Sequence, residues 1–201
     1  MKLVMIMDKR RCFGCNGCTV ACKQANATPP GTFYTKTLTE EHGKFPNSKI
    51  GYMPLICNHC DNAPCVSVCP TKASKKLADG TVQVTASECI GCQMCMEACP
   101  YGARYFNAED KPTYWGDKGQ DVYEKQRSGE HVKGTVEKCT FCVSRRERGL
   151  VPACVDTCPA IARIFGDLDD PSSEVSKVFK KFKPKPYLPE KGTKPSVFYI
   201  E

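Results

Sequence analysis

Residues 89–100 read CIGCQMCMEACP, a run in which four cysteines are separated by two, two and three residues and are followed by a proline. The 16 cysteines of the chain fall into four groups of four, and every group closes with a spacing of three residues. In chain order the groups are Cys12, Cys15, Cys18 and Cys22; Cys57, Cys60, Cys65 and Cys69; Cys89, Cys92, Cys95 and Cys99; and Cys139, Cys142, Cys154 and Cys158. This internal repeat decides the fold.

Cysteines spaced by two, two and three residues are typical ligands of 4Fe-4S clusters, in which the fourth cysteine binds the other cluster of a pair. Proline follows the closing cysteine in three groups, as Pro70, Pro100 and Pro159. Because proline cannot continue a helix, the chain turns away after its last ligand. The sequence therefore predicts four 4Fe-4S clusters held by all 16 cysteines, and a protein that transfers electrons.

Two other uses of cysteine are weaker interpretations. Disulfide frameworks belong mainly to short secreted domains, and nothing in this sequence marks secretion. Zinc remains an alternative for the fourth group alone, where two pairs of cysteines are split by a spacer of 11 residues. The tight triplets of the first and third groups do not suit tetrahedral zinc.

Composition favours a small protein built around inorganic centres. With 201 residues, 15 glycines and 15 prolines, the chain has room for one or two loop-rich domains. Bound clusters would supply folding free energy that a small hydrophobic core cannot. The formal charge of +7 treats cysteine as neutral, and bound thiolates bring the loaded protein close to neutrality. A nucleic-acid partner is not predicted, because no RNA-binding motif accompanies the positive charge.

Targeting signals are not evident in the sequence. The apolar run of residues 3–7 is too short for the core of a signal peptide and is predicted to be a strand. No stretch reaches the apolar length needed to span a bilayer. We expect no direct membrane insertion and no export signal in the chain itself.

The second and third groups form a predicted inner module, residues 57–106. Between them, an Asp-Gly turn at residues 79–80 is flanked by strand-like residues, which predicts a hairpin over residues 77–84. This unit resembles a two-cluster bacterial ferredoxin. Exchange of the fourth ligands predicts one cluster on Cys57, Cys60, Cys65 and Cys99, and another on Cys69, Cys89, Cys92 and Cys95.

The first and fourth groups form a predicted outer module from residues 1–22 and 139–166. The same exchange predicts one cluster on Cys12, Cys15, Cys18 and Cys158, and another on Cys22, Cys139, Cys142 and Cys154. A contiguous arrangement, in which Cys22 closes its own group, stays open as the alternative. The predicted fold class is α+β, with two ferredoxin-like two-cluster modules, one inserted in the other.

Two insertions and a tail complete the chain. Residues 23–56 are predicted to contain strands at 32–39 and 50–56, and residues 107–138 form a polar stretch. Each insertion is either a docking surface or a cap on the cluster modules. In the tail, residues 167–201, a short helix capped by Ser172 or Ser173 is expected, followed by an extended segment with a strand near 196–200.

No residues for substrate chemistry are evident. A Ser/His/Asp arrangement, a phosphate loop and a dinucleotide fingerprint are not found. His59 lies between two cysteines, where it either tunes a cluster or has a structural or solvent-facing role. No catalytic residue is predicted.

The whole chain resembles a known family. Its four groups, and the phrases CNHC at 57–60, CIGC at 89–92, ACPYGA at 98–103 and GTKP at 192–195, are similar to the four-cluster iron-sulfur subunits of molybdopterin oxidoreductases of the dimethyl sulfoxide reductase family. The resemblance implies a larger catalytic subunit with a molybdenum or tungsten pterin cofactor, and a quinone-reactive membrane anchor or a soluble donor. It also implies that the cluster on Cys12, Cys15, Cys18 and Cys158 lies nearest the catalytic subunit.

Localisation and the exact assembly stay open on this resemblance. Relatives are often exported in folded form by a partner with a twin-arginine signal, so both cytoplasm and periplasm are compatible with it. A free polyferredoxin, and the electron-transfer subunit of a formate dehydrogenase or hydrogenase complex, are the alternative functions.

Overall fold

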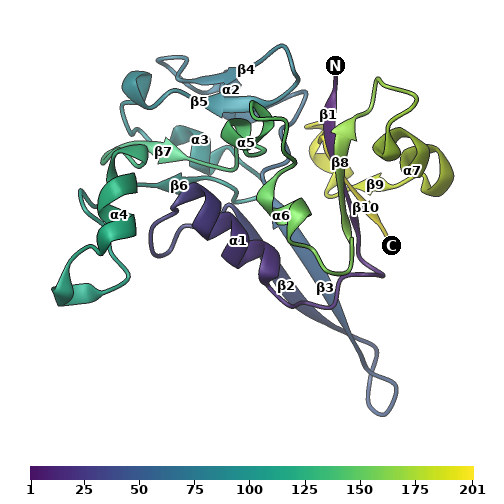
Figure 1. The fold of residues 1–201 in the computed structure, drawn as a ribbon. Coiled ribbons are helices and arrows are strands. Elements are labelled where there is room, and N and C mark those ends of the chain that lie inside the picture. The colour runs from purple at the N-terminus through teal and green to yellow at the C-terminus, as the bar shows by residue number, and fades with distance from the viewer.

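The computed structural model describes residues 1–201, apart from the side chain of Ser128. Short helices and short strands alternate along the chain (Figure 1). The strands are β1 Leu3–Asp8, β2 Thr35–His42, β3 Lys49–Ile56, β4 Ser74–Lys76, β5 Val82–Val84, β6 Tyr105–Phe106, β7 Val136–Glu137, β8 Arg163–Asp167, β9 Lys185–Pro186 and β10 Val197–Ile200. The α-helices are α1 Gly17–Asn26, α2 Pro64–Ser67, α3 Met94–Glu97, α4 Val122–Arg127, α5 Val143–Arg146, α6 Ala153–Asp156 and α7 Glu174–Phe182. Single 3-10 turns span Ala86–Glu88, Gly116–Lys118, Ser128–Glu130 and Pro189–Lys191.

The strand β1 lies inside the four-stranded sheet β8-β1-β10-β9 and joins the two ends of the chain. It pairs antiparallel with β8 and parallel with β10, so the first and last strands lie side by side (Figure 1). All six residues of β1 are buried. The predicted N-terminal strand and the predicted C-terminal strand are both confirmed, and the C-terminal strand packs on its own chain.

The two faces of β1 meet different cores. Leu3, Met5 and Met7 pack in a core that also contains cysteines of the first, second and fourth groups. Val4 and Ile6 face α7, in a smaller core with Val175 and Ile200. Because side chains alternate along a strand, one apolar run supports both the cluster side and the tail side of the sheet.

Helix α7 begins directly after its capping residue, Ser173. The Ser173 side chain accepts a hydrogen bond from the backbone N–H of Ser176, 3.1 Å away, and leaves the preceding residues outside the helix. The expected cap at Ser172 or Ser173 is therefore confirmed at Ser173. Phe179 of this helix packs edge-on against Phe198 of β10, with ring centroids 4.9 Å apart.

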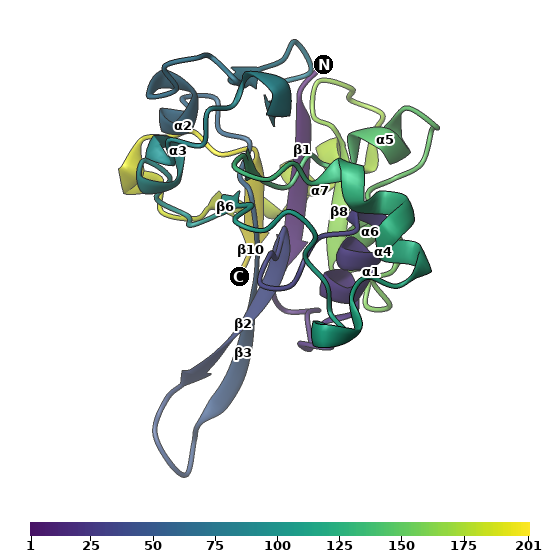
Figure 2. The same ribbon diagram turned by 90° about the vertical axis from the view of Figure 1, so that its left-hand side faces the viewer.

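Two predicted hairpins are present. β2 and β3 pair antiparallel from Thr35 opposite Ile56 to His42 opposite Lys49, and they extend away from the rest of the molecule (Figure 2). β4 and β5 flank the Asp-Gly turn, where the Asp79 carboxylate accepts hydrogen bonds from the backbone N–H and hydroxyl of Thr81. β6 pairs with β7 and joins the two ends of the segment between residues 106 and 136.

Short helices carry cysteines of the four groups and pack in pairs. α1 contacts α6, and α2 contacts α3. Each pair brings together helices whose cysteines belong to different groups: the first and fourth groups for α1 and α6, the second and third for α2 and α3. Within the part of the chain that the structure describes, no helix has the length and apolar character needed to cross a membrane.

The sheet gives a direct test of its core. Replacing fully buried Ile6 with alanine removes apolar contacts beneath α7 and should destabilise the protein by about 2 to 5 kcal/mol. We expect the unfolding temperature of the cluster-loaded protein, measured without oxygen, to fall by several degrees. The matched change Ile50→Ala, at a position that is 65% exposed, should leave that temperature almost unchanged; an equal loss in both variants would contradict this assignment of the core.

Candidate iron-sulfur sites

Four cysteines from opposite ends of the chain line one small cavity. Two distant segments meet here: the segment that leads into α1 and the segment that follows α6. The cysteines lining this cavity are Cys12, Cys15, Cys18 and Cys158. The guanidinium-bearing residue Arg163 lines the same cavity. Cys158 is 140 residues or more from the other three in sequence, so the fold brings this set together.

A second cavity lies deeper, between α1 and α6. Its cysteines are Cys22, Cys139, Cys142 and Cys154, and all four are buried. Asn26, one turn beyond Cys22 on α1, lines it as well and donates from Nδ2 to the Sγ atoms of Cys22, at 3.4 Å, and Cys142, at 3.9 Å. Cys22 therefore lies with cysteines of the fourth group.

The remaining cysteines form two further sets. One cavity is lined by Cys69, Cys89, Cys92 and Cys95. In the other set, the charges of Cys57, Cys65 and Cys99 act on Cys60. Three shared cavities and one electrostatic grouping thus hold the cysteines that fourth-ligand exchange would combine. That these groups are the cluster ligands stays a prediction.

Left-handed backbone conformations help to position these cysteines. In the two tightest groups the residue directly before the second cysteine is a left-handed glycine, Gly14 with φ 73° or Gly91 with φ 68°. A Cβ atom on Gly91 would lie only 2.2 Å from the carbonyl oxygen of Gly134. Glycine is needed at this position for both its φ angle and its lack of a side chain.

Hydrogen-bond donors surround the sulfur atoms. Backbone N–H groups of Ser74, Val136 and Ala162 donate to the Sγ atoms of Cys69, Cys89 and Cys158, at 3.5, 3.5 and 3.3 Å. Donors of this kind stabilise negative charge on a thiolate, and in iron-sulfur proteins they help to set the reduction potential.

Burial shapes the protonation of the free thiols. It raises the pKa of Cys60 to about 12 and that of Cys154 to about 11, and it raises the pKa of Cys139 well above its ordinary value. Iron binds the thiolate, so loading such a site releases protons and replaces a costly buried charge by a metal bond. Sets of four cysteines, of which all but Cys15 and Cys92 are buried or half-buried, with N–H donors nearby, suit 4Fe-4S clusters.

Two buried arginines are residues that the sequence reasoning missed. The Arg163 Nη2 atom donates to the Sγ of Cys18 at 3.2 Å, and Arg104 lies among cysteines of the inner sets. In each arginine one guanidinium nitrogen is buried without a hydrogen-bond partner among the described protein atoms. Both follow a closing cysteine by five residues, in the repeated pattern Cys-Pro-x-x-Ala-Arg at 99–104 and 158–163. That repeat was the available signal.

His59 is packed in the interior of the protein. It is fully buried, its ring stacks on Phe141 with centroids 3.8 Å apart, and its Nδ1 atom accepts a hydrogen bond from the backbone N–H of Val82 at 3.1 Å. The solvent-facing alternative is wrong. Burial, together with the charges of Lys138, Arg146 and Arg104, lowers the pKa of His59 well below its ordinary value, so the ring is neutral.

The insertion at 107–138 caps helix α1. Its side chains reach the last carbonyls of that helix: Tyr123 Oη donates to the carbonyl of Gln24, Arg127 Nη2 to that of Ala25 at 3.1 Å, and His131 Nε2 lies 2.9 Å from that of Asn26. These carbonyls have no partners within the helix. The insertion thereby holds the helix that carries Cys18 and Cys22.

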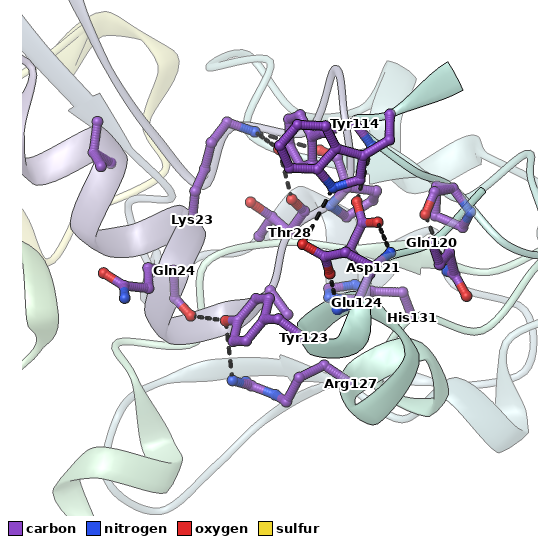
Figure 3. Close-up of a pocket in the computed structure, with 15 residues that line it drawn as sticks. Lys23, Gln24, Thr28, Tyr114, Gln120, Asp121, Tyr123, Glu124, Arg127 and His131 are labelled. Atoms are coloured by element: carbon purple, nitrogen blue, oxygen red, sulfur yellow. Dashed lines mark hydrogen bonds between the residues drawn. The ribbon is translucent and has the colours of Figure 1, made fainter. Parts of the chain in front are cut away.

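A separate cavity of about 340 Å³ lies between α1 and this insertion (Figure 3). Tyr114, Trp115 and Tyr123 give it an aromatic lining, and Lys23 donates to the hydroxyl of Tyr114 at 2.8 Å. The capping interpretation of the insertion accounts for these contacts. That the insertion is also a docking surface stays a prediction.

The sites define the class of protein: an iron-sulfur electron carrier with its cysteines in four sets. Comparison with protein families agrees. A family described as a 4Fe-4S dicluster domain matches residues 48–116 and 120–168, and a second family of the same description matches residues 11–73. Together with the 16 cysteines, these matches fit four 4Fe-4S clusters. They also cover the fourth group, for which zinc was the alternative.

Relatives extend along the full chain. The arsenate respiratory reductase iron-sulfur subunit of Shewanella sp. is 44% identical, covering 100% of this chain and 96% of the relative. A putative dimethyl sulfoxide reductase iron-sulfur subunit of Halobacterium salinarum is 46% identical over 98% of this chain and 78% of the relative. A tetrathionate reductase subunit of Salmonella typhimurium is 39% identical over 99% and 72%. The chain belongs to this family of iron-sulfur electron-transfer subunits.

The capping contact of His131 predicts a pH dependence. Burial acts to lower the pKa of His131, but the hydrogen bond to Glu137, 2.7 Å away, and the charge of that carboxylate outweigh it, so the pKa is raised. A raised folded-state pKa stabilises the protein below the ordinary histidine value of about 6.5, and the gain is lost as pH rises through the folded value.

We therefore expect the anaerobic unfolding temperature of the loaded protein to fall as pH rises above about 6.5, and to fall less in His131→Gln. His42→Gln, on the exposed hairpin strand β2, is the matched control and should keep the wild-type profile. A profile in His131→Gln that is parallel to wild type would exclude this contribution.

Proposed function

We propose that this chain is the electron-transfer subunit of an oxidoreductase whose larger catalytic subunit holds a molybdenum or tungsten pterin cofactor. The observation that carries the proposal is the full-length identity to iron-sulfur subunits of arsenate and dimethyl sulfoxide reductases. Such a subunit moves one electron at a time between neighbouring clusters, and the substrate is converted elsewhere.

The proposed ligand sets are those of fourth-ligand exchange. Cluster 1 takes Cys12, Cys15, Cys18 and Cys158; cluster 2 takes Cys22, Cys139, Cys142 and Cys154; cluster 3 takes Cys69, Cys89, Cys92 and Cys95; and cluster 4 takes Cys57, Cys60, Cys65 and Cys99. Shared cavities support the first three sets, and electrostatic proximity to Cys60 supports the fourth.

The module boundaries follow from these sets. We assign residues 1–22 and 139–166 to an outer two-cluster module and residues 57–106 to an inner one, with 23–56 and 107–138 as insertions and 167–201 as a tail. Packing of α1 on α6 and of α2 on α3 supports this division, because the cysteines of each helix pair lie within one proposed module. Helix α1 itself continues to Asn26, beyond the proposed boundary at residue 22.

An order of clusters can also be proposed, running 1, 2, 4, 3. Arg163 lies between cysteines of clusters 1 and 2, at Cys18 and Cys154. Cys57 acts electrostatically on Cys139, which brings cluster 4 next to cluster 2. Arg104 lies between clusters 4 and 3, at Cys65 and Cys95.

Exposure supports the same order. Cys15 and Cys92 are the exposed cysteines among the described residues, and they belong to clusters 1 and 3. All four cysteines of cluster 2 are buried. Electrons would enter and leave at clusters 1 and 3, with cluster 1 nearest the catalytic subunit. The donor at the other end is a soluble protein or a quinone-reactive membrane anchor.

Cysteine variants test the ligand sets. We expect Cys158→Ser to change the paramagnetic resonance signal of the same cluster as Cys12→Ser, because both remove a ligand of cluster 1. Cys22→Ser should change the signal shared with Cys139→Ser. A Cys22→Ser protein in which the Cys12 cluster is altered instead would favour the contiguous arrangement.

Native purification tests the partner. When the tagged chain is isolated without oxygen from its source cells, a larger subunit containing molybdenum or tungsten should co-purify with it. The chain itself should contribute about sixteen iron atoms. The large subunit would identify the substrate, and its signal peptide would distinguish periplasm from cytoplasm. About sixteen iron atoms per chain with neither metal and no large partner would favour a free polyferredoxin.

A further inference from the structure

The two buried arginines occupy equivalent places in the repeat. Arg104 and Arg163 each lie five residues after a closing cysteine, and each is preceded by a left-handed residue two positions earlier, Gly102 or Ile161. Arg104 is 4% exposed and Arg163 is 3% exposed. The chain therefore turns in the same way after Cys99 and Cys158 and directs an arginine into the interior both times.

Arg163 lies between the proposed clusters 1 and 2. Its Nη2 atom donates to Cys18 Sγ at 3.2 Å and to Thr35 Oγ1 at 2.9 Å. It lines the cavity of the first set, and its charge also acts on Cys154 of the second set. One side chain thus acts on ligands of two neighbouring sets.

Arg104 occupies the corresponding place between clusters 3 and 4. Its Nη1 atom donates to Ser74 Oγ at 2.9 Å, and Ser74 in turn donates from its backbone N–H to Cys69 of cluster 3. The groups that act most strongly on its charge are Cys65 of cluster 4 and Cys95 of cluster 3. The inner module repeats the arrangement of the outer one.

Each guanidinium also has one buried nitrogen atom without a hydrogen-bond partner among the described residues. The unpaired atoms are Nη1 of Arg163 and Nη2 of Arg104. Arginine carries five N–H donors and stays charged at all physiological pH values, and an unsatisfied buried donor is costly. Cluster sulfur would supply the missing acceptor at each site.

We propose that Arg104 and Arg163 each raise the redox potentials of the two clusters between which they lie. Arg163 would act on clusters 1 and 2, and Arg104 on clusters 3 and 4. This inference rests on the proposed cluster sites. In each transfer one cluster would gain an electron that the neighbouring cluster loses, and no bond forms or breaks. A fixed positive charge and N–H donors in a low-dielectric interior stabilise the added electron at both clusters.

Pairwise tuning has a functional consequence. Two adjacent clusters that carry extra negative charge repel each other, which would hinder passage of electrons along the series. A guanidinium between them offsets that repulsion for whichever cluster holds the electron. Because arginine does not titrate in the physiological range, this effect should be independent of pH.

The test is a redox titration of the full chain with paramagnetic resonance detection of each cluster. In Arg163→Gln, we expect the ratio of reduced to oxidised cluster at a fixed potential to fall by about tenfold in clusters 1 and 2, a downward shift of about 59 mV for a one-electron centre. Clusters 3 and 4 should change little. Arg104→Gln should give the reverse pattern.

Arg148→Gln is the matched control. It removes the same charge from an exposed arginine in the fourth cysteine segment, where the side chain donates to the carbonyl of Ser144, and should leave all four potentials unchanged. The conservative variants Arg163→Lys and Arg104→Lys keep the charge but lose the two-sided donor geometry. They should shift the same pairs in the same direction by less than the glutamine variants.

Iron content decides how the result is interpreted. With wild-type iron in the variants, unchanged potentials, a shift in only one cluster, or an equal shift in all four would overturn the proposal. Loss of iron from both the glutamine and the lysine variants would also overturn it, because the arginines would then act in assembly. A wild-type chain without four clusters would instead refute the proposed function.

Discussion

The structure depends on one electrostatic constraint: 16 sulfur ligands must be gathered into a small interior without leaving their negative charge uncompensated. Burial raises the pKa of several of these thiols, so the charged form is unfavourable until iron binds. Backbone N–H groups, Asn26 and two arginines provide the compensating donors. These donors come from different kinds of element: Ser74 and Arg163 begin the strands β4 and β8, and Asn26 ends helix α1.

The same requirement explains why the two ends of the chain pack against each other. Cys22 lines one cavity with Cys139, Cys142 and Cys154. The pairing of β1 with β8 and β10 and the packing of α1 on α6 bring these distant parts of the chain together. The apolar faces of β1 stabilise this closure from both sides. The insertion at 107–138 adds a second constraint, since it holds the C-terminal end of α1 through the side chains of Tyr123, Arg127 and His131.

The positions of the solvent-exposed cysteines relate the fold to electron transfer. The exposed cysteines lie in two different sets, and the set around Cys22 and Cys139 is buried. A chain that passes electrons between two partners needs access at both ends and shielding of the intermediate sites from solvent. The full-length similarity to reductase subunits places this arrangement within a family of electron-transfer subunits.

The sequence by itself determined the cofactor class, because thiolate chemistry and cysteine spacing are local properties. It also predicted the N-terminal strand, the β2–β3 and β4–β5 hairpins and a helix cap at Ser172 or Ser173, because local patterns of residue types indicate such elements. Only the tertiary structure decided that His59 is buried, that Arg104 and Arg163 lie beside cysteines of two sets, and that the 107–138 insertion caps α1. Contacts between residues far apart in the chain depend on how the whole chain packs, and a linear pattern of residue types does not encode them directly.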